Sequence, residues 1–357
     1  MAGKIAASDE AIVVVTACDE KYAHGAAAAI RSAIDSVGGQ QPMRVFVLDG
    51  GITPRTKMRL RRSWRGKKVT VSFLTPDLNA IRDMPVSDHI NLSTYLRILM
   101  AELLPSDVER AIYLDADTIV LRDLRELWSV PLEDYYCAAT QDVFVPVLNP
   151  FEAFSHPIHI VTMKMTIPYP IPNYRELGLS GTAPYFNAGI MLANVDKWRR
   201  EQVAKRAFEC LRTNGDNVRY WDQYALNTLF SGNWKIVDPR WNQNSHVFRI
   251  PSWDLSHYTE EVFNLVKQDP WIVHFDYKPK PWDLESKHPF RKQFFQALDR
   301  TAWWWWRPRR SMRENAELAV KYSGDLFRSY RRWRQTRFSP VVRAWKYRLL
   351  GRKPKAA

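Results

Sequence analysis

Residues 11–17, Ala-Ile-Val-Val-Val-Thr-Ala, form a run that is rich in β-branched residues and apolar throughout. A strand with one exposed face would alternate apolar and polar residues, and this run does not. It therefore predicts a strand buried on both faces, as central strands of parallel sheets are. Parallel neighbours need long crossover connections, so helices should separate this strand from the next ones.

Strand-like and helix-like segments do alternate over the first 130 residues. We expect strands over residues 11–17, 43–48, 69–73 and 111–114, and helices over 22–37, 53–64 and 92–104, two of which end at Gly38-Gly39 and at Pro105. Further segments follow over 185–195, over 203–214 and from Asp222. This order predicts an α/β domain with a largely parallel sheet, whose ligand lies outside the carboxyl ends of the strands. The chain has neither a G-x-G-x-x-G after its first strand nor a Walker-type loop.

Two aspartates interrupt the apolar segment 111–120. In an extended chain, residues two apart point to the same side, so Asp115 and Asp117 should converge just past a strand end. Two like charges held this close are costly unless a cation lies between them. A divalent metal that carries a phosphate is the natural partner. Taken alone, however, an Asp-x-Asp pattern is more often two solvated carboxylates in a surface turn.

The surrounding residues resemble a known family. Residues 113–118, Tyr-Leu-Asp-Ala-Asp-Thr, together with 123–128, Asp-Leu-Arg-Glu-Leu-Trp, are similar to retaining glycosyltransferase family 8, which includes glycogenin and bacterial lipopolysaccharide galactosyl- and glucosyltransferases. Four more segments match in the same order: 94–97 (Thr-Tyr-Leu-Arg), 185–192 (Tyr-Phe-Asn-Ala-Gly-Ile-Met-Leu), 221–227 (Trp-Asp-Gln-Tyr-Ala-Leu-Asn) and 274–282 (His-Phe-Asp-Tyr-Lys-Pro-Lys-Pro-Trp). The resemblance spans residues 11–285.

The resemblance implies a GT-A-type, Rossmann-like nucleotide-sugar domain over residues 1–300 with a mostly parallel central sheet. It implies a Mn²⁺ or Mg²⁺ site formed by Asp115, Asp117 and His274, and oxygen ligands with one imidazole suit these ions better than zinc. Without the family pattern, His274 would be a core histidine. The nucleotide of a UDP-sugar would contact Ala17, Asp19, Tyr22, Ala116, Tyr277 and Lys280.

The donor sugar would be held by short polar side chains and backbone in a rigid arrangement. The candidates are Arg97, Asp142, Asn187, Ala188, Asp222 and Gln223. The resemblance places Gln223 near the anomeric carbon, with Asp222 as the second catalytic candidate. A carboxamide is a poor nucleophile, so we expect front-face, ion-pair-like substitution with retention. For Asp142 a turn or helix-cap role is an equally open interpretation.

One residue departs from the family pattern, and one segment is longer than an ordinary connection. At the third position after His274 the family usually has glycine, which lets the backbone approach the diphosphate, whereas this chain has Tyr277. Either the backbone shifts there or the tyrosine hydroxyl makes the contact. Residues 143–184 are proline-rich and too long for an ordinary connection, which favours an acceptor loop over a disordered insertion.

Almost all excess charge lies near the C-terminus. Residues 301–357 hold 16 basic and 3 acidic residues, which gives +13 of the net +14, while residues 1–300 hold 36 and 35. Trp303–Trp306 precede a basic stretch with an apolar stripe, for which we expect a helix from Ser311 to Thr336 and a second helix over 341–350. Tryptophan with arginine is typical of an interfacial segment, so we expect a membrane-association tail. A tail packed on the domain and a nucleic-acid contact are the alternatives, and we expect no nucleic acid.

The function predicted is a metal-dependent retaining hexosyltransferase that moves glucose or galactose from a UDP-sugar to a lipopolysaccharide or other lipid-linked glycan. Three separated cysteines, no secretory pattern and no run of about 20 apolar residues favour a cytoplasmic protein peripheral to the inner face of the membrane. One alternative is an inactive protein that binds sugar nucleotides or tethers to membrane. The other is a haloacid-dehalogenase-type phosphatase, which expects Thr or Val where Ile119 stands and a downstream acidic pair.

Overall fold

The structure is a computed structural model that describes residues 10–39, 41–77, 92–153, 169–309 and 328–329. The chain divides into two compact units, Met1–Trp306 and Arg307–Ala357. Only residues 307–309 and 328–329 of the second unit are described, so both expected tail helices lie outside the described residues. Within the described part, no helix combines the length and apolar character needed to cross a membrane.

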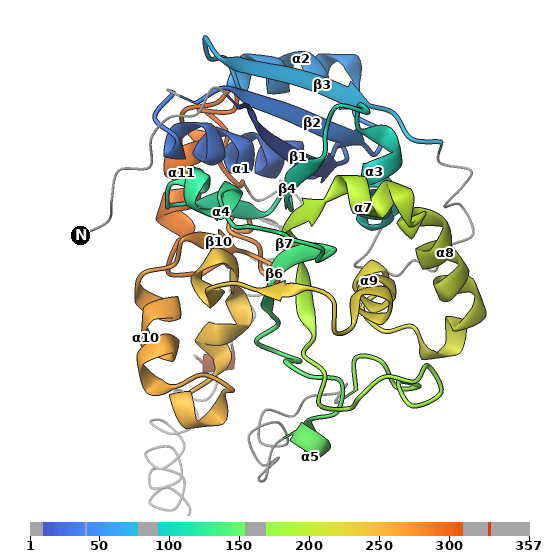
Figure 1. Cartoon of the computed structure of the whole chain (residues 1–357). Helices are drawn as coiled ribbons and strands as arrows, with labels where there is room; N and C mark the ends of the chain where they lie inside the picture. The colour runs from blue at the N-terminus through green and yellow to red at the C-terminus, as the bar shows by residue number, and fades with distance from the viewer. Residues whose placement is uncertain (1–9, 40, 78–91, 154–168, 310–327, 330–357) are drawn as a thin grey trace, which may run out of the picture. The chain divides into compact units, whose positions relative to one another are not determined.

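A seven-stranded sheet forms the centre of the first unit (Figure 1). Its order is β3-β2-β1-β4-β7-β6-β8, and its strands are β1 (Ile12–Cys18), β2 (Met43–Asp49), β3 (Val69–Leu74), β4 (Arg110–Leu114), β6 (Cys137–Gln141), β7 (Phe186–Asn194) and β8 (Lys235–Ile236). β7 is antiparallel to both neighbours, and the other pairs are parallel. Every residue of β1 is buried. The expected mostly parallel α/β fold is therefore confirmed.

Ten α-helices are described: α1 (Ala23–Ser36), α2 (Pro54–Ser63), α3 (Met100–Leu103), α4 (Leu124–Trp128), α5 (Pro150–Ala153), α7 (Val195–Arg200), α8 (Val203–Thr213), α9 (Asp222–Phe230), α10 (Glu260–Gln268) and α11 (Arg291–Leu298). Short 3₁₀ segments are η2 (Leu92–Leu99), η3 (Gly215–Asn217), η4 (Pro239–Asn242), η5 (Ser245–Arg249) and η6 (Trp253–Leu255). A second, three-stranded sheet has the order β5-β10-β9, from Thr118–Val120, Ile272–His274 and Gln243–Asn244.

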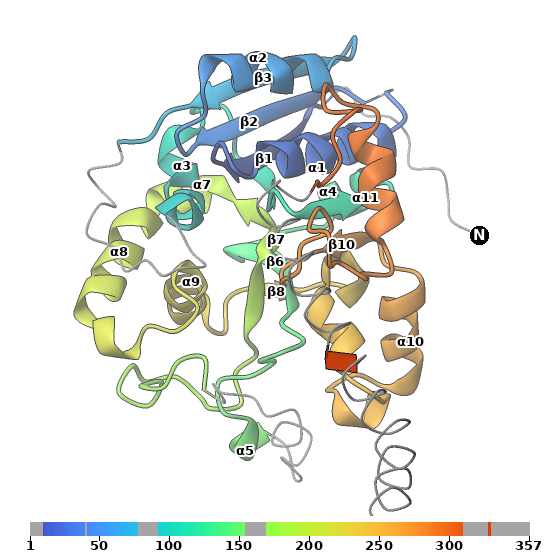
Figure 2. The same ribbon diagram turned by 180° about the vertical axis from the view of Figure 1, so that it is seen from behind.

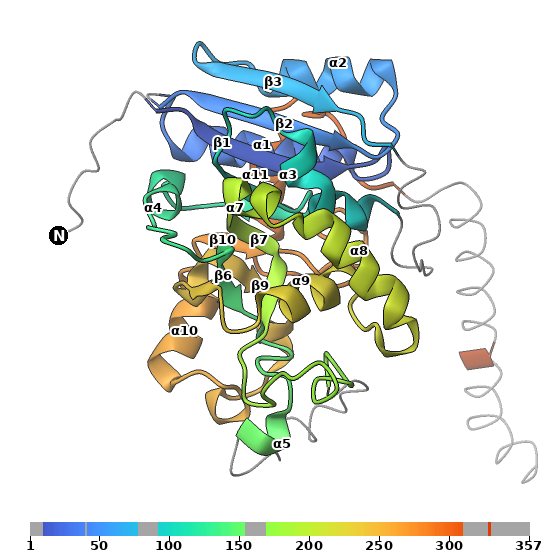
Figure 3. The same cartoon turned by 45° about the vertical axis from the view of Figure 1, so that its right-hand side comes forward.

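The order in which successive strands are added to the sheet reverses at β1 and β4. The order β3-β2-β1 grows away from β1 through α1 and α2, whereas η2 and α3 carry the chain back to β4 on the other side of β1. Right-handed crossovers in opposite directions place their helices on opposite faces of the sheet. Figure 3 shows α1 and α3 on either side of the strands. A ligand of such a sheet binds where the order reverses, beyond the ends of β1 and β4.

Small residues let α1 lie close to this point. Its alanines from Ala26 to Ala29 are fully buried. A Cβ on Gly25 would lie 2.6 Å from the carbonyl oxygen of Ala116 and 3.0 Å from the Trp282 ring. Glycine at this position therefore lets α1 reach the loop between Asp115 and Asp117.

Three segments differ in detail from the sequence expectations. The helix expected over 92–104 is a 3₁₀ segment followed by one short α-helix. The described ends of segment 143–184 lie together, because Val147 bridges Pro184 and Asn149 N donates to Gly181 O at 2.6 Å. Residues 301–306, grouped with the tail on sequence grounds, pack against the first unit, where Ala302 N donates to Ser63 Oγ at 2.9 Å.

Candidate active site

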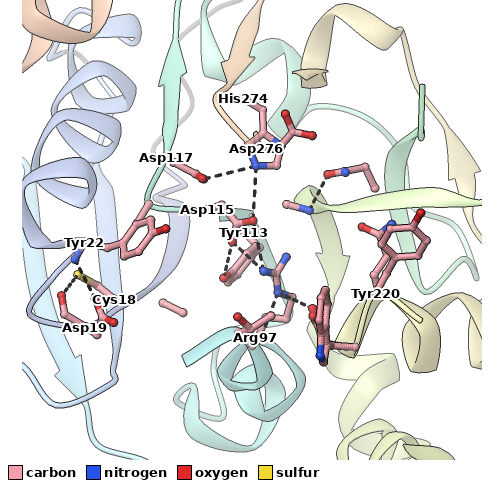
Figure 4. Close-up of a pocket in the computed structure, with 18 of the residues that line it drawn as sticks. Cys18, Asp19, Tyr22, Arg97, Tyr113, Asp115, Asp117, Tyr220, His274 and Asp276 are labelled. Carbon is pink, nitrogen blue, oxygen red and sulfur yellow. Dashed lines mark hydrogen bonds and ion pairs between the residues drawn. The ribbon is translucent and has the colours of Figure 1, made fainter. Parts of the chain in front are cut away.

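Two carboxylates and one imidazole meet at the end of β4. Asp115 and Asp117 lie in the loop between β4 and β5, and His274 is the last residue of β10. Because β10 pairs antiparallel with β5, His274 stands opposite Thr118. Its Nε2 atom lies 3.6 Å from Asp115 Oδ2 and 3.4 Å from Asp117 Oδ1. One ligand atom from each of the three residues lies within 4.8 Å of the others, and Figure 4 shows them facing one another.

The backbone of β7 forms one wall of this cluster. Gly189 O accepts a hydrogen bond from Asp115 N at 2.8 Å. A Cβ on Gly189 would lie 2.2 Å from His274 Cε1 and 2.8 Å from Asp115 Oδ2. Any side chain at this position would displace the histidine or the carboxylate. The glycine of the Phe-Asn-Ala-Gly segment therefore shapes the candidate metal site.

A second hydrogen bond fixes the histidine for ligation. The Nδ1 atom of His274 lies 3.0 Å from Asn242 Oδ1, and Asn242 Nδ2 donates to Asn187 Oδ1 at 2.9 Å. An amide oxygen only accepts, so Nδ1 carries a proton, and Nε2 is the ring atom that faces Asp115 and Asp117. Metal-ligating histidines are oriented in this way by their other ring nitrogen. The residues present therefore fit a divalent cation.

Arg97 joins the metal candidates to the start of α9. Its Nη2 lies 2.9 Å from Asp115 Oδ1, its Nε lies 2.8 Å from Asp222 Oδ2, and its Nη1 donates to Ala188 O at 2.6 Å. Tyr113 Oη also donates to Asp115 Oδ1, at 3.0 Å. Arg97 is only 6% exposed, so these contacts form in a region shielded from water. They hold both acids in fixed orientations.

Burial shifts the protonation of these acids. It raises the pKa of Asp222 to about 6, although the Arg97 guanidinium opposes the change. It also raises the pKa of Asp115 against the effect of Arg97. Both carboxyl groups are thus less readily ionised than in water, and a cation beside them would favour the charged forms.

Lys280 reaches the second aspartate from the segment after β10. Its Nζ atom lies 2.6 Å from Asp117 Oδ2 and donates to Phe275 O at 2.6 Å. Burial would raise the pKa of Asp117, but Lys280 and His274 hold that pKa well below its usual range. Burial would lower the pKa of Lys280, but Asp117 raises it above its ordinary value. At neutral pH, Asp117 is thus a carboxylate and Lys280 a cation at this end of the cavity.

Gln223 sits in a network of neutral and charged hydrogen bonds. Its Oε1 accepts from Ala188 N at 2.9 Å, and its Nε2 lies 3.4 Å from Asp142 Oδ2. Asn187 Nδ2 donates to the same Asp142 oxygen at 3.0 Å. Asp142 is 5% exposed and organises both amides from behind. It positions candidate sugar-binding groups rather than lining the cavity itself.

The two residues before α9 adopt an unfavourable backbone conformation. Tyr220 and Trp221 have φ angles of 55° and 50°, in the left-handed region that bulky residues rarely occupy. The turn they form sets Asp222 and Gln223 at the first turn of α9. Such strain is retained where the surroundings demand it, most often at functional sites.

The metal candidates, Arg97, Lys280 and the first residues of α9 line one cavity of about 280 Å³, drawn in Figure 4. Twelve of the predicted site residues line it: Ala17, Asp19, Tyr22, Arg97, Asp115, Ala116, Asp117, Asn187, Asp222, Gln223, His274 and Lys280. Ala188 and Asp142 stand behind it, and Tyr277 lies elsewhere. The other lining residues, outside the predicted set, are Cys18, Thr94, Tyr113, Gly189, Tyr220, Trp221 and Asp276.

Tyr277 does not line the cavity in which a diphosphate contact was expected. Its ring centroid is 5.0 Å from that of His246, and the Arg249 guanidinium lies 4.5 Å above it. It is 43% exposed. The residue before it, Asp276, lines the cavity instead. The Asp276 carboxylate accepts a hydrogen bond from Ser245 N at 2.8 Å.

Comparison with known proteins identifies relatives over most of the chain. The General stress protein A of Bacillus subtilis is 28% identical over 301 residues, 83% of this chain and 96% of that protein. A lipopolysaccharide 1,2-glucosyltransferase of Escherichia coli is 24% identical over 288 residues, 80% of this chain and 77% of that protein. The crystal structure of the galactosyltransferase LgtC with donor and acceptor sugar analogues has a TM-score of 0.67 at 23% identity, covering 81% of this chain and 96% of that one. The last likeness confirms the expected GT-A-type fold.

The sequence profile described as Glycosyl transferase family 8 matches residues 13–285. That range contains both sheets except Ile12, and every residue of the cavity. The expectation drawn from the five ordered motifs is therefore confirmed. The chain belongs to glycosyl transferase family 8 and is an enzyme that transfers glycosyl groups.

Proposed function

We propose that the protein transfers a hexose, glucose or galactose, from a UDP-sugar to a glycan acceptor with retention of anomeric configuration. The observation that carries this proposal is the Asp115–Asp117–His274 cluster in the same cavity as Gln223. The cluster offers hard ligands for a cation, and the amide offers a neutral polar group for a sugar. The names of the lipopolysaccharide glucosyl- and galactosyltransferase relatives support a hexose as the group transferred.

Asp115, Asp117 and His274 would hold a Mn²⁺ or Mg²⁺ ion through two oxygens and one nitrogen. When bound, the ion would neutralise the diphosphate leaving group. Lys280 would stabilise negative charge on the departing phosphate, since its ammonium is already fixed beside Asp117 at 2.6 Å. Asp19 and Tyr22, at the end of β1, would contact the uridine.

Retention would proceed on one face of the sugar. Asp222 is 3% exposed and paired with Arg97 at 2.8 Å, which restricts its use as a nucleophile. Gln223 presents a carboxamide, and that group is too weak a nucleophile to form a stable glycosyl intermediate. We therefore propose an ion-pair-like, front-face substitution in which Gln223 orients the donor sugar. A trapped glycosyl adduct on Asp222 would contradict it.

The acceptor we propose is a lipopolysaccharide or another lipid-linked glycan. Supporting this are the names of two relatives, the long proline-rich segment 143–184 as an acceptor loop, and the basic, tryptophan-rich residues 301–357. The catalytic domain would comprise residues 1–300 and the terminal segment would associate with membrane. The protein would then work at the cytoplasmic face of an anionic membrane.

The test is turnover of a panel of UDP-hexoses, with and without Mn²⁺, measured as released UDP. We expect slow metal-dependent hydrolysis without acceptor, and loss of at least about 100-fold in Asp117→Ala, because the removed carboxylate is a ligand. Asp254→Ala, in the distant segment η6, is the matched control and should keep full activity. Binding of UDP-sugar without turnover under any metal would support the inactive alternative instead.

A further inference from the structure

One stretch of the first unit carries a concentrated positive charge. Residues 54–68, which begin with α2, contain eight basic and no acidic residues. Of the 36 basic residues in 1–300, these eight leave 28 against 35 acidic ones elsewhere, so the rest of that range is net negative. The near-neutral average of the main body therefore conceals a basic pole at α2.

The segment after α11 packs against this pole, and Figure 2 shows it rising to α2. Arg59 Nη2 donates to Ala302 O at 3.2 Å, and the Arg59 guanidinium lies 3.9 Å above the Trp303 ring. Trp303 is only 5% exposed. With the bond from Ala302 to Ser63, these contacts fix residues 301–306 on α2.

Large apolar side chains are exposed beside the arginines. Trp304 is 65% exposed, Trp305 57% and Met58 50%. Arg55, Arg62 and Trp305 line an open recess of about 720 Å³, together with Arg59. Neither Arg55 nor Arg62 has an ion-pair partner among the described residues.

One acid also lines the recess, but its charge is engaged. The Glu20 carboxylate accepts from Thr53 N at 2.9 Å and from Thr56 Oγ1 at 2.6 Å. Its neighbour Asp19 lines the donor cavity. With Arg55, Arg59 and Arg62 against Glu20, the recess is net positive, and Glu20 belongs to the same turn as Asp19 of the donor cavity.

We propose that Arg55, Met58, Arg62, Trp304 and Trp305, called here the α2–tryptophan surface, bind the phosphate-rich face of an anionic lipid bilayer. The inference rests on the proposed function, in which the acceptor is lipid-linked. Arginines attract anionic headgroups, while indole rings and a methionine enter the interface. Phosphates of a nucleic acid would use the arginines but would leave three large apolar groups exposed to water, so the bilayer fits better. The catalytic unit would then contact membrane directly, in addition to the tail.

Co-sedimentation of the full chain with vesicles tests the proposal. The vesicles are phosphatidylcholine with about 30% phosphatidylglycerol, and pure phosphatidylcholine, at two salt concentrations. In Arg55→Gln/Arg62→Gln we expect the partition coefficient on anionic vesicles to fall roughly 25-fold, since each basic residue contributes about five-fold. Trp304→Ala/Trp305→Ala should reduce it on both vesicle types. Lys205→Gln/Arg212→Gln on α8 and Trp253→Ala, all at exposed positions, are matched controls and should bind like the unchanged protein.

The proposal is overturned if either double variant binds anionic vesicles as tightly as the unchanged protein, because all membrane affinity would then come from residues 307–357. Loss of binding to a labelled single-stranded oligonucleotide, with vesicle binding intact, would overturn it in favour of nucleic acid. Donor hydrolysis should stay unchanged in every variant, since none lines the cavity. Absence of hydrolysis in the unchanged protein would refute the proposed function and leave the vesicle result to be judged by itself.

Discussion

Asn242 fixes the candidate metal ligand His274 from behind, through a 3.0 Å hydrogen bond to Nδ1. Removal of such a supporting group typically weakens metal binding 10- to 100-fold, by order of magnitude, because the imidazole loses its tautomer and orientation. We predict a loss of this size in Mn²⁺ affinity for Asn242→Ala, measured by titration calorimetry on the folded protein. Asn173→Ala is the control, since that buried amide bonds Tyr224 far from the cluster. Equal Mn²⁺ affinity in both variants would refute the role of Asn242.

Gly189 tests the same site from the other side. A methyl group there would meet His274 at 2.2 Å, which the rigid β7 backbone cannot relieve. We predict that Gly189→Ala abolishes metal-dependent donor turnover and lowers the free energy of unfolding by about 1–3 kcal/mol, as overpacking does. Gly215→Ala should do neither, because no atom lies within 4 Å of its added Cβ. Urea denaturation and released UDP measure the two effects, and an active Gly189→Ala enzyme would contradict the geometry.

For single residues, the sequence predicts the side chains that belong to a chemical motif. It does not predict the residues that hold those side chains in place. Asp115, Asp117 and His274 were named from sequence, and the structure brings them together. Asn242 carries no comparable signal, because it is one amide in an irregular segment whose partner is 32 residues away. Tyr277 was assigned to the diphosphate by its place in a motif, but its side chain packs on His246 instead. Motif position predicts the path of the backbone better than the direction of a substituted side chain.

The helix α1 carries a histidine that should stay neutral. Burial lowers the pKa of His24 to about 4, and Arg59 adds to the effect. The ring lies between Trp282 and Trp306, at 4.8 and 4.5 Å. A histidine with a lowered folded pKa stabilises the fold above its ordinary pKa of 6.5, and this stability is lost as the pH falls toward 4.

We therefore predict that, between pH 7 and pH 5, the free energy of unfolding falls by about 2 kcal/mol less in His24→Phe than in the unchanged protein. Denaturant titrations at the two pH values measure this difference. Trp306→Phe changes the same ring cluster without removing a titratable group, so its pH dependence should match that of the unchanged protein. If His24→Phe keeps the full pH dependence, the pKa of His24 is not lowered in the folded state.

Elements were predictable where their own residues determine them. The runs at β1, β2 and β4 are largely apolar, β3 alternates apolar and polar residues over most of its length, and each forms a strand close to the expected bounds. β10 has three residues and becomes a strand only through pairing with β5 and β9, which are distant in sequence. Residues 95–99 are all buried, so their burial does not distinguish an α-helix from the observed 3₁₀ segment.

Over the whole molecule, average composition hid the distribution of charge. The tail accounts for nearly all of the net +14, yet α2 and the residues after it form a second basic region within a net negative remainder. Sequence alone does not reveal that residues 301–306 complete this region, because the contact joins Arg59 to a carbonyl 243 positions later. Contacts over such separations are set by packing of the whole unit.

The boundary between catalytic unit and tail follows from that packing and gives the last prediction. A chain that ends at Trp306 keeps Trp303 under the Arg59 guanidinium, whereas one that ends at Arg300 loses it. Loss of a buried tryptophan typically costs about 3–5 kcal/mol. We expect the 1–306 chain to match the full chain in unfolding free energy and donor hydrolysis, and the 1–300 chain to be destabilised by about 3 kcal/mol. Equal stability of both truncated chains in urea would show that residues 301–306 belong with the tail, as the sequence first suggested.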